Sequence, residues 1–581
     1  MWLNVNTVEE TGFLTGEALK HWKAQFLTDS SSVCQELIKH AREYDKTEEE
    51  VIEFAVEQIP NLMKLTDTAG MSLFSEGYVT SIEASFAAGF TYLQDSTGRV
   101  YIVTQCPDLS LKTVEALDRL KDYSPVLAIC NNHILGMVYS LFVEPAIISS
   151  KAQQIATSMT GDSDSAKTRA DSETRQLFNA FLSVGIKLGA SDLHFIPCEA
   201  YCEVQYRVDG RYEKYDTIPL PLLQRVNNII LTDSGVGVGK DPHKPIDAKF
   251  RFSPSQGKVN GDEQDIRVSI MGAHAGPDIV LRYLSSRLFS FDDIGMSVRN
   301  VKLYKHLLGL PQGLVIQVGP VGSGKSTTLY SGLDYIHKMH KSIITAEDPV
   351  EIKMDGITQV DVDPLGQKNM TFADALRASL RHDPDVVVVG ELRDRDTAEE
   401  ALRAANTGHL VLTSLHTNDA IGVFERLINI GMDPYSIGEV LAAVIGQRLV
   451  RRLCPKCKRL VTIDPDDPKY KEFHLAGYWG HQPRQIYEAC GCSECRNKGY
   501  KGRVAVNEVL VVDSTLRYDI QCRSKRTKYE DYLKKTRFET IYADALNRVA
   551  DGTTSLEEIR HIAEDTMAFK GYQWGHTEKE V

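Results

Sequence analysis

The chain has 581 residues and a formal net charge of −13, with 42% hydrophobic and 25% charged residues. Such a length exceeds what one compact core holds, so we expect several domains. The acidic balance argues against a constitutive nucleic-acid-binding protein, because neutralising phosphates requires a basic surface. The longest apolar stretch, 134–143, is half of the roughly twenty residues that a membrane-spanning helix needs. Because the first residues also lack the pattern of a secretory signal, we expect a cytoplasmic protein.

The first 148 residues are predicted to form two N-terminal units. In residues 1–65, apolar side chains that follow the acidic start at Glu48 recur with helical spacing, which predicts a helical region. Residues 66–148 are predicted to form a small α/β domain. Its expected elements are strands at 100–104 and 126–129 and a helix at 111–120.

A polar stretch at 149–175 separates these units from the rest of the chain. It contains few apolar side chains to bury, which predicts a flexible linker. The next segment, 176–285, returns to folded patterning. Its residues 201–208 alternate in polarity and end at Asp209 and Gly210, which is typical of a β-hairpin. Further strands are expected at 265–270 and 279–283.

From residue 299 onward, short apolar strands alternate with helical patterns. Continuous apolar runs of this kind are typical of buried parallel strands. The runs lie at 314–318, 342–346, 386–389 and 410–415. The pattern predicts an α/β nucleotide-binding core, which a linker at 286–298 joins to the preceding domain.

A glycine-rich loop with the sequence GPVGSGKS, residues 319–326, lies between a predicted strand and a helical pattern. In this context the motif G-x-x-x-x-G-K-S binds nucleotide phosphates through backbone N–H groups and the helix N-terminus. We expect Lys325 to reach the β- and γ-phosphates and Ser326 to ligate Mg²⁺. The expected nucleotide-binding residues are Gly319, Pro320, Gly322, Ser323, Gly324, Lys325, Ser326, Thr327, Glu347 and Asp348.

Two acidic sites follow this loop, each at the end of a predicted strand. Glu347, Asp348 and Glu351 follow one strand, and Glu391 follows the next. Carboxylates at the carboxyl ends of parallel strands face the ligand crevice. Acidic residues in such positions also cap helices or lie in solvent. Two such sites after one phosphate-binding loop nevertheless favour roles in metal binding and water positioning.

Two histidines, His409 and His416, bracket the strand predicted at 410–415. A single histidine is more often a hydrogen-bonded structural residue than a ligand contact. Because this pair flanks a core strand, we expect one end of the strand to sense the γ-phosphate.

Four cysteines form two C-x-x-C pairs, Cys454 with Cys457 and Cys492 with Cys495. Four thiolates in this arrangement suit a closed tetrahedral zinc site, and the metal would help the polar segment between the pairs to fold. A redox C-x-x-C is the alternative, but it lacks a thioredoxin-like setting here. Cys490 is a competing ligand. The other six are expected to be buried thiols: Cys34, Cys106, Cys130, Cys198, Cys202 and Cys522.

With these motifs in this order, residues 175–570 resemble the secretion ATPase superfamily, the hexameric motors of type II secretion and type IV pilus assembly. The loop at 319–326 and the stretches 345–351, 390–391 and 408–417 look like that family's Walker A, Asp box, Walker B and His box. Residues 189–194 resemble the start of its PAS-like domain. Residues 447–454 and 499–503 resemble the segments that flank its tetracysteine zinc subdomain.

The resemblance implies an α/β fold with several parts. A RecA-like P-loop NTPase core would occupy 299–581 and include a small zinc-binding subdomain at 450–503. A PAS-like α+β domain would precede it at 176–285. The extra N-terminal α/β domains would come first, with residues 1–65 as a helical docking region.

The resemblance also assigns roles at the nucleotide. Glu351 would orient or activate the attacking water, and Glu391 would hold Mg²⁺ through water. The remaining catalytic candidates would contact the phosphates or stabilise the site: His409 and His416 from the core, and Arg267 and Arg282 from across the interdomain cleft. The implied cofactors are ATP, Mg²⁺ and Zn²⁺.

The resulting hypothesis is a homohexameric cytoplasmic ATPase that powers type IV pilus assembly at an inner-membrane platform protein. A further cytoplasmic assembly component is an expected partner, and a direct nucleic-acid partner is not. Since the family's retraction motors lack the tetracysteine insert, an extension or secretion motor is favoured. A type II secretion pseudopilus motor is the alternative. A DNA-translocating conjugation ATPase and a scaffold without hydrolysis are the rivals. The acidic charge argues against the first, and the glutamates at both acidic sites argue against the second.

Overall fold

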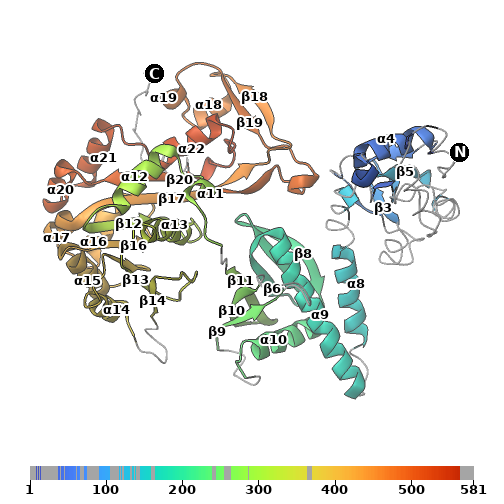
Figure 1. Ribbon diagram of the computed structural model, residues 1–581, viewed down its shortest axis with the longest axis horizontal. Coiled ribbons are helices and arrows are strands. Elements are labelled where there is room, and N and C mark those ends of the chain that lie inside the picture. Colours follow the sequence, from blue (N-terminus) through green and yellow to red (C-terminus); the bar gives the residue numbers. More distant parts are fainter. Residues whose placement is uncertain are drawn as a thin grey trace.

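The computed structural model describes residues 164–562 apart from 238–243, 254–262, 285–286 and 363–369. Before residue 164 it describes 41–44, 46–59, 62–65, 71–74, 90–104, 123–130 and 144–158, together with isolated positions. Three larger sheets follow one another along the chain (Figure 1). Among the helices in these ranges, none is long and apolar enough to span a bilayer.

The N-terminal unit contains a five-stranded sheet in the order β1-β5-β4-β3-β2. Its elements are η1 Ala41–Tyr44, α4 Glu48–Gln58, β1 Leu62–Lys64, β2 Ser72–Leu73, β3 Phe90–Gln94, β4 Val100–Thr104 and β5 Val126–Ile129. Helix α4 begins at a capping box, in which Thr47 and Glu50 each bond the other's backbone. The predicted helix near Glu48 and the two predicted strands are confirmed. The helix predicted at 111–120 lies almost entirely outside the described residues.

Two helices occupy most of the segment predicted to be a flexible linker, 149–175. Helix α8 spans Glu144–Ser158 and α9 spans Asp164–Leu188. Three side chains of α8, spaced one helical turn apart, are buried in the same apolar cluster as residues of α9. They are Ile148, Ala152 and Ile155. The prediction of an unstructured segment is therefore corrected, because a few well-spaced apolar residues anchor a helix that is largely polar over 149–158.

The middle unit is a six-stranded antiparallel sheet in the order β8-β7-β6-β11-β10-β9, packed against α9 and α10. Its remaining elements are β6 Ala190–Pro197, β7 Cys202–Val208, β8 Arg211–Ile218, α10 Leu220–Asp233, β9 Ile246–Phe252, β10 Gln264–Ala273 and β11 Gly276–Leu284. The predicted hairpin joins β7 to β8. Asp209 and Gly210 both have positive φ, of 49° and 86°, as a two-residue hairpin turn requires.

The third unit is built on a seven-stranded sheet in the order β14-β13-β15-β16-β12-β17-β20. All neighbouring strands are parallel except β17 and β20. The strands are β12 Gly313–Val318, β13 Ile343–Glu347, β14 Thr358–Asp361, β15 Val386–Val389, β16 Leu410–Leu415, β17 Leu441–Leu453 and β20 Tyr500–Val511. The four strands predicted for this core are confirmed.

Helices cover both faces of this sheet (Figure 1). They are α11 Phe291–Ile294, α12 Val298–Leu308, α13 Lys325–His337, α14 Phe372–Ser379, α15 Arg395–Asn406, α16 Gly422–Asn429, α17 Pro434–Val440, α20 Ser514–Gln521, α21 Arg526–Lys535 and α22 Ile541–Ala550. In β15, Val387 and Val389 belong to the cluster on one face, while Val386 and Val388 belong to the cluster on the other.

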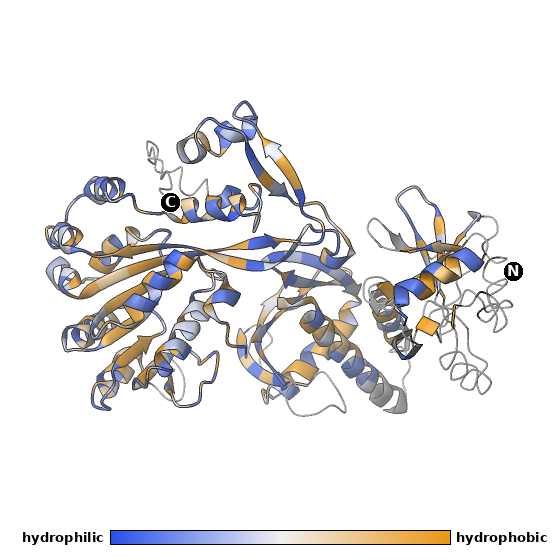
Figure 2. Cartoon of the chain, turned by 45° about the horizontal axis from the view of Figure 1, so that its top comes forward, coloured by the Kyte–Doolittle hydropathy of each residue, from blue (hydrophilic) through white to orange (hydrophobic). Residues whose placement is uncertain are grey.

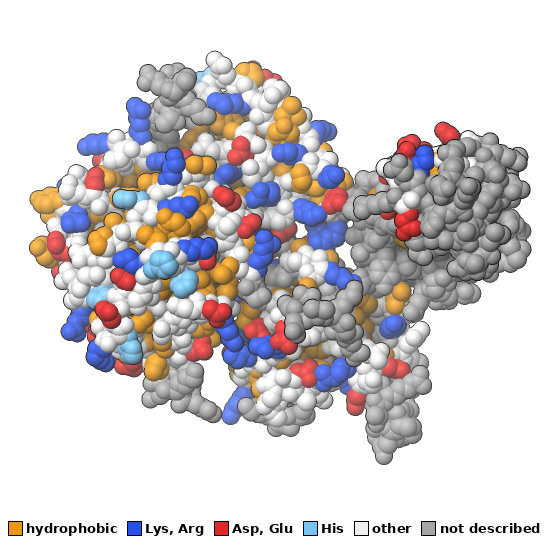
Figure 3. Space-filling model, viewed as in Figure 1, with side chains coloured by type: hydrophobic (Ala, Val, Ile, Leu, Met, Phe, Trp, Pro, Cys, Tyr) orange, Lys and Arg blue, Asp and Glu red, His pale blue; other side chains and the backbone are white. Residues whose placement is uncertain are grey.

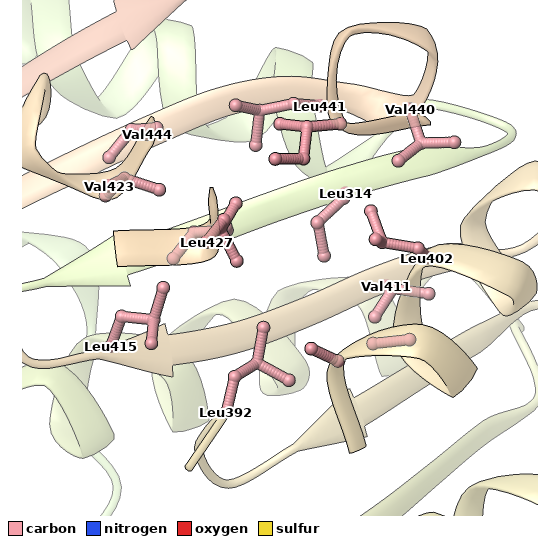
Figure 4. Packing of buried hydrophobic residues seen from close by; sticks show 14 of the residues in the cluster. Leu314, Leu392, Leu402, Val411, Leu415, Val423, Leu427, Val440, Leu441 and Val444 are labelled. Atoms are coloured by element: carbon pink, nitrogen blue, oxygen red, sulfur yellow. The ribbon is translucent and has the colours of Figure 1, made fainter. Parts of the chain in front are cut away.

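Because both faces are buried, the inner strands β12, β13, β15 and β16 are mostly apolar (Figure 2). Figure 4 shows side chains of β12, β16 and β17 packing against those of the helices on one face.

A small subdomain is inserted between β17 and β20. It contains β18 Arg459–Ile463, α18 Pro468–Glu472, α19 Ala476–Trp479, β19 Arg484–Glu488 and η4 Ser493–Cys495. The strands β18 and β19 form a separate two-stranded sheet. This insert shares a buried cluster with α22, so it packs on the core instead of standing apart.

Replacing Ile155 by Ala tests the packing of α8. The side chain is 5% exposed, so the substitution should cost about 2–5 kcal/mol of local stability. Amide hydrogen exchange within α8 should then speed up. Lys151→Ala, at an exposed position of the same helix, is the matched control and should leave exchange nearly unchanged. Equal protection of α8 in the wild-type chain and in Ile155→Ala would contradict this packing.

Candidate nucleotide-binding site

The glycine-rich loop lies between the end of β12 and the start of α13, at the carboxyl edge of the parallel strands. Gly319, Gly322 and Gly324 have φ values of 151°, 78° and 84°, which other residues adopt only with strain. The Nζ of Lys325 donates hydrogen bonds to the carbonyl oxygens of Gly319, at 2.8 Å, and Pro320, at 3.1 Å. The loop is thus a backbone cradle with one cation above it, which suits an anionic ligand.

Charged groups on other elements surround this lysine. Burial lowers the pKa of Lys325, the carboxylate of Glu391 opposes that shift, and the guanidinium of Arg448 adds to it. Glu391 follows β15, and Arg448 lies in β17. The structure therefore brings two of the predicted catalytic residues together, Lys325 and Glu391. Arg448 joins them from a strand that the sequence analysis did not connect with the phosphates.

Glu347 is held by hydrogen bonds at the end of β13. Thr345 donates to it at 2.6 Å, Gln359 of β14 donates at 3.3 Å, and the hydroxyl of Tyr330 donates as well. The same hydroxyl accepts the backbone N–H groups of Glu351, at 3.1 Å, and Ile352. Tyr330, which the sequence analysis missed, thereby fixes the acidic segment to α13.

Glu351 faces the nucleotide loop. Burial raises the pKa of its carboxyl group above the usual range, even though part of the side chain remains open to solvent. A hydrogen bond with Ser326 opposes the shift, Glu347 adds to it, and Arg282 and Arg267 oppose it. A carboxyl group with a raised pKa beside the Mg²⁺-ligating position is suited to accept a proton from water.

Both arginines come from the middle unit. Arg267 of β10 and Arg282 of β11 are register partners in adjacent strands. The Nε of Arg282 donates to the carboxylate of Asp192 on β6 at 2.8 Å, and Asp192 is buried. Since both arginines act on the carboxyl of Glu351, the middle unit presents two positive charges to the nucleotide site.

His416 lies at this site, but His409 does not. The Nε2 of His416 is 3.5 Å from the Oε2 of Glu391. Strand β16 runs parallel to β12, so His409 precedes β16 at the opposite edge of the sheet, about 20 Å from the loop. There its Nδ1 lies 3.0 Å from the carbonyl oxygen of Ala404 at the end of α15. Of the two histidines predicted here, only His416 is brought to the site.

One arginine, Arg393, lies near a carboxylate of each acidic site. Arg393 pairs with Glu391 and lies 3.6 Å from Asp348. The remaining predicted nucleotide-binding residues, Pro320, Ser323 and Thr327, are in the loop or the first turn of α13. The carboxylates of both acidic sites therefore lie around the same loop.

The loop that follows His416 is anchored by a buried glutamate. Glu508 of β20 accepts the backbone N–H groups of Ala420, at 2.9 Å, and Ile541, at 3.2 Å. Burial raises the pKa of Glu508 from the usual 4.5 to about 7. Its backbone hydrogen bonds and Arg448 partly oppose this shift, while Asp419 adds to it. This carboxyl group therefore titrates near neutral pH.

The four cysteines of the two C-x-x-C pairs converge as predicted. Their sulfur atoms all lie within 4.8 Å of one another, with Sγ–Sγ distances of 3.9 Å for Cys454–Cys492 and 3.8 Å for Cys457–Cys495. A tetrahedral metal site with metal–sulfur bonds of about 2.3 Å requires sulfurs about 3.8 Å apart, so the geometry fits. Backbone N–H groups of Gly491 and Gly499 donate to two of these sulfurs.

The other cysteines fulfil the prediction only in part. Cys130 and Cys202 are buried, and Cys198 is half-buried. Cys522 is exposed, which corrects its expected burial, because it caps the end of α20 at the surface. Cys490 is exposed and lies outside the four-cysteine group. Cys34 and Cys106 lie outside the described residues.

Comparisons with known proteins show which family the chain resembles in sequence. The family model described as type II/IV secretion system protein matches residues 167–561. The type II secretion system ATPase E of Vibrio cholerae is 36% identical over 415 residues, which cover 71% of this chain and 80% of that protein. The type IV pilus assembly ATPase PilB of Acinetobacter baylyi is 36% identical over 411 residues, which cover 69% of this chain and 68% of that protein.

A solved structure shows the same fold. The ATPase DotB of Yersinia pseudotuberculosis superposes with a TM-score of 0.51 at 22% identity, covering 67% of this chain and 94% of that chain.

Replacing Glu508 by Gln tests its titration. The pKa of Glu508 is higher in the folded chain than its usual value, so its contribution to stability is greatest below about pH 4.5 and declines as pH rises to about 7. The melting temperature of the wild-type chain relative to Glu508→Gln should therefore fall by a few degrees between pH 5 and pH 8. Glu199→Gln, at an exposed position, should show no such trend. A constant difference between wild type and Glu508→Gln across this range would contradict the assignment.

Proposed function

The chain belongs to the type II/IV secretion system protein family and is a motor ATPase of secretion or pilus assembly, and we propose that it forms a homohexamer that powers type IV pilus assembly at an inner-membrane platform protein. The observation that carries the proposal is the convergence of Lys325, Glu391 and Glu351 around one glycine-rich loop. These groups are what hydrolysis of a nucleoside triphosphate requires.

At this site each side chain has a distinct task. Lys325 binds the β- and γ-phosphates. Ser326 would hold Mg²⁺, which would supply positive charge against the phosphates. Glu351 orients the attacking water and accepts its proton. Glu391, which lies beside His416, would hold Mg²⁺ through water.

The two sheet units support the finer domain assignments. The third unit, with its glycine-rich loop after a central parallel strand, is consistent with a RecA-like core at 299–581. The middle unit, an antiparallel sheet with helices on it, is consistent with a PAS-like domain at 176–285. Arg267 and Arg282 of this unit would contact the phosphates from across the interdomain cleft. Residues 1–65 and 66–148 would dock on the platform protein, which keeps the motor peripheral to the membrane.

A type II secretion pseudopilus motor is the second candidate. The secretion relative from Vibrio cholerae and the pilus relative from Acinetobacter baylyi are equally similar to this chain, at 36% identity. A DNA-translocating motor is disfavoured by the net charge of −13. Acidic and basic side chains are interspersed over the face of the molecule shown in Figure 3. Stimulation of ATP hydrolysis by DNA would reverse this preference.

The four-cysteine group is proposed to hold zinc. Four thiolates at tetrahedral spacing form a closed site, which is typical of structural Zn²⁺. The site joins the two ends of the inserted subdomain, because Cys454 and Cys457 follow β17 while Cys492 and Cys495 precede β20. Zinc would therefore stabilise the insert and take no part in hydrolysis.

Metal analysis tests the zinc site. The purified chain should contain one zinc per molecule, and Cys457→Ser should lose most of it together with thermal stability of the insert. Cys490→Ser is the matched control, since Cys490 is nearby in sequence and outside the group; it should keep its zinc. Zinc loss in Cys490→Ser to the same extent would show that the ligand set is different.

Mutation of the acidic site tests hydrolysis. Glu391→Gln should keep ATP binding within about threefold and lower turnover by about 100-fold or more, because it removes a charge needed in the transition state. Lys325→Ala should weaken binding itself. Glu399→Gln, at an exposed position of α15, should leave both quantities unchanged. Unchanged turnover in Glu391→Gln would overturn its assigned role.

A further inference from the structure

A buried amide lies directly beneath the glycine-rich loop. Gly446 of β17 pairs with Val318, the last residue of β12, so the next residue of β17, Gln447, lies beside the first residue of the loop. Its side chain is almost completely buried, at 2% exposure. A buried polar side chain is costly unless its hydrogen bonds are made.

Hydrogen bonds use both ends of this amide. Its Nε2 donates to the carbonyl oxygen of Ser323 at 2.8 Å. Its Oε1 accepts from the hydroxyl of Thr328 at 2.9 Å and from the Nδ2 of Asn507 at 2.9 Å. The carbonyl of Ser323 can only accept, so the atom of the Gln447 amide that contacts it is the nitrogen. The atom that accepts from Thr328 and Asn507 is therefore the oxygen.

The bond to Ser323 has a consequence for the phosphate cradle. In a trans peptide the C=O and the following N–H point in opposite directions. Because Gln447 draws the carbonyl of Ser323 toward β17, it turns the N–H of Gly324 away from β17. Thr328 is held by the same amide, so Lys325 and Ser326 lie between two fixed points.

Gln447 also explains why two positions of the loop are glycines. A Cβ on Gly319 would lie 2.4 Å from the backbone oxygen of Gln447, and a Cβ on Gly324 would lie 2.8 Å from its Nε2. The loop therefore packs against Gln447 so closely that no side chain fits at either position. Asn507 of β20, which donates to Gln447, is itself held in place: its backbone N–H donates to the carboxylate of Asp544 in α22 at 2.8 Å.

We propose that Gln447 is a positioning residue for the nucleotide, which orients the loop N–H groups and the start of α13 toward the phosphates. The inference rests on the proposed nucleotide binding by this loop. It adds a residue of β17 that acts through the loop backbone and does not touch the ligand.

Gln447→Leu tests the inference by removing all three hydrogen bonds at nearly constant volume. We expect the Kd for a fluorescent ATP analogue and the KM for ATP to rise about tenfold, with a smaller change in kcat. Gln317→Leu is the matched control, because Gln317 is a buried amide of the neighbouring strand β12 that bonds Tyr304 at 2.8 Å. Its Kd and KM should stay within twofold of wild type. Equal affinities in Gln447→Leu and wild type, at matched melting temperatures, would overturn the proposal.

Gln447→Glu provides a readout that a purely structural role would not move. A carboxyl group at this position accepts from Thr328 and Asn507, but it donates to the Ser323 carbonyl only when protonated. Burial raises the pKa of such a group, so the KM of Gln447→Glu relative to wild type should fall as the pH is lowered from 8 to 6. A ratio that does not change with pH would contradict the proposal. Absence of ATP binding by the wild-type chain would instead contradict the proposed function.

Discussion

The close approach of the glycine-rich loop to β17 is the constraint on which the site depends. Backbone N–H groups can surround phosphates only where no side chain blocks the approach. Gly319 and Gly324 lie so close to β17 that a Cβ at either position would clash with Gln447. The central position of β12, with β16 on one side and β17 on the other, brings this loop to the middle of the sheet edge. There the residues that follow β13, β15 and β16 can reach it.

The chemistry of Glu351 depends on two units of the chain. Partial desolvation beside the loop raises its pKa, while Arg267 and Arg282 of the middle unit lower it. If the middle unit moves away, the arginines no longer favour the ionised form, and the pKa of the Glu351 carboxyl group rises further. The position of the middle unit and the basicity of Glu351 are therefore linked through electrostatics.

Sequence patterns predicted the features whose determinants are local. The loop motif, the apolar strands and the two C-x-x-C pairs depend on short spacings, and each was confirmed. His409 lies away from the glycine-rich loop because of strand direction, since the loop follows the carboxyl ends of the parallel strands and His409 precedes β16. Its expected role stays a prediction. Helix α8 was missed because few apolar residues anchor it. The contacts of Tyr330, Arg448 and Gln447 at the loop were missed because they join segments far apart in sequence. Residues 447–454 were noted only as a segment that flanks the zinc subdomain.

The inserted subdomain leaves and rejoins the core at adjacent points. Leu453, at the end of β17, pairs with Tyr500, at the start of β20, and the N–H of Cys454 donates to the carbonyl of Gly499. The two ends of the insert are therefore already held together by the sheet. A segment attached in this way adds to the core without interrupting the order of its strands. A tight turn in its place would preserve that order, but it would expose the apolar side chains of α22 that the insert covers.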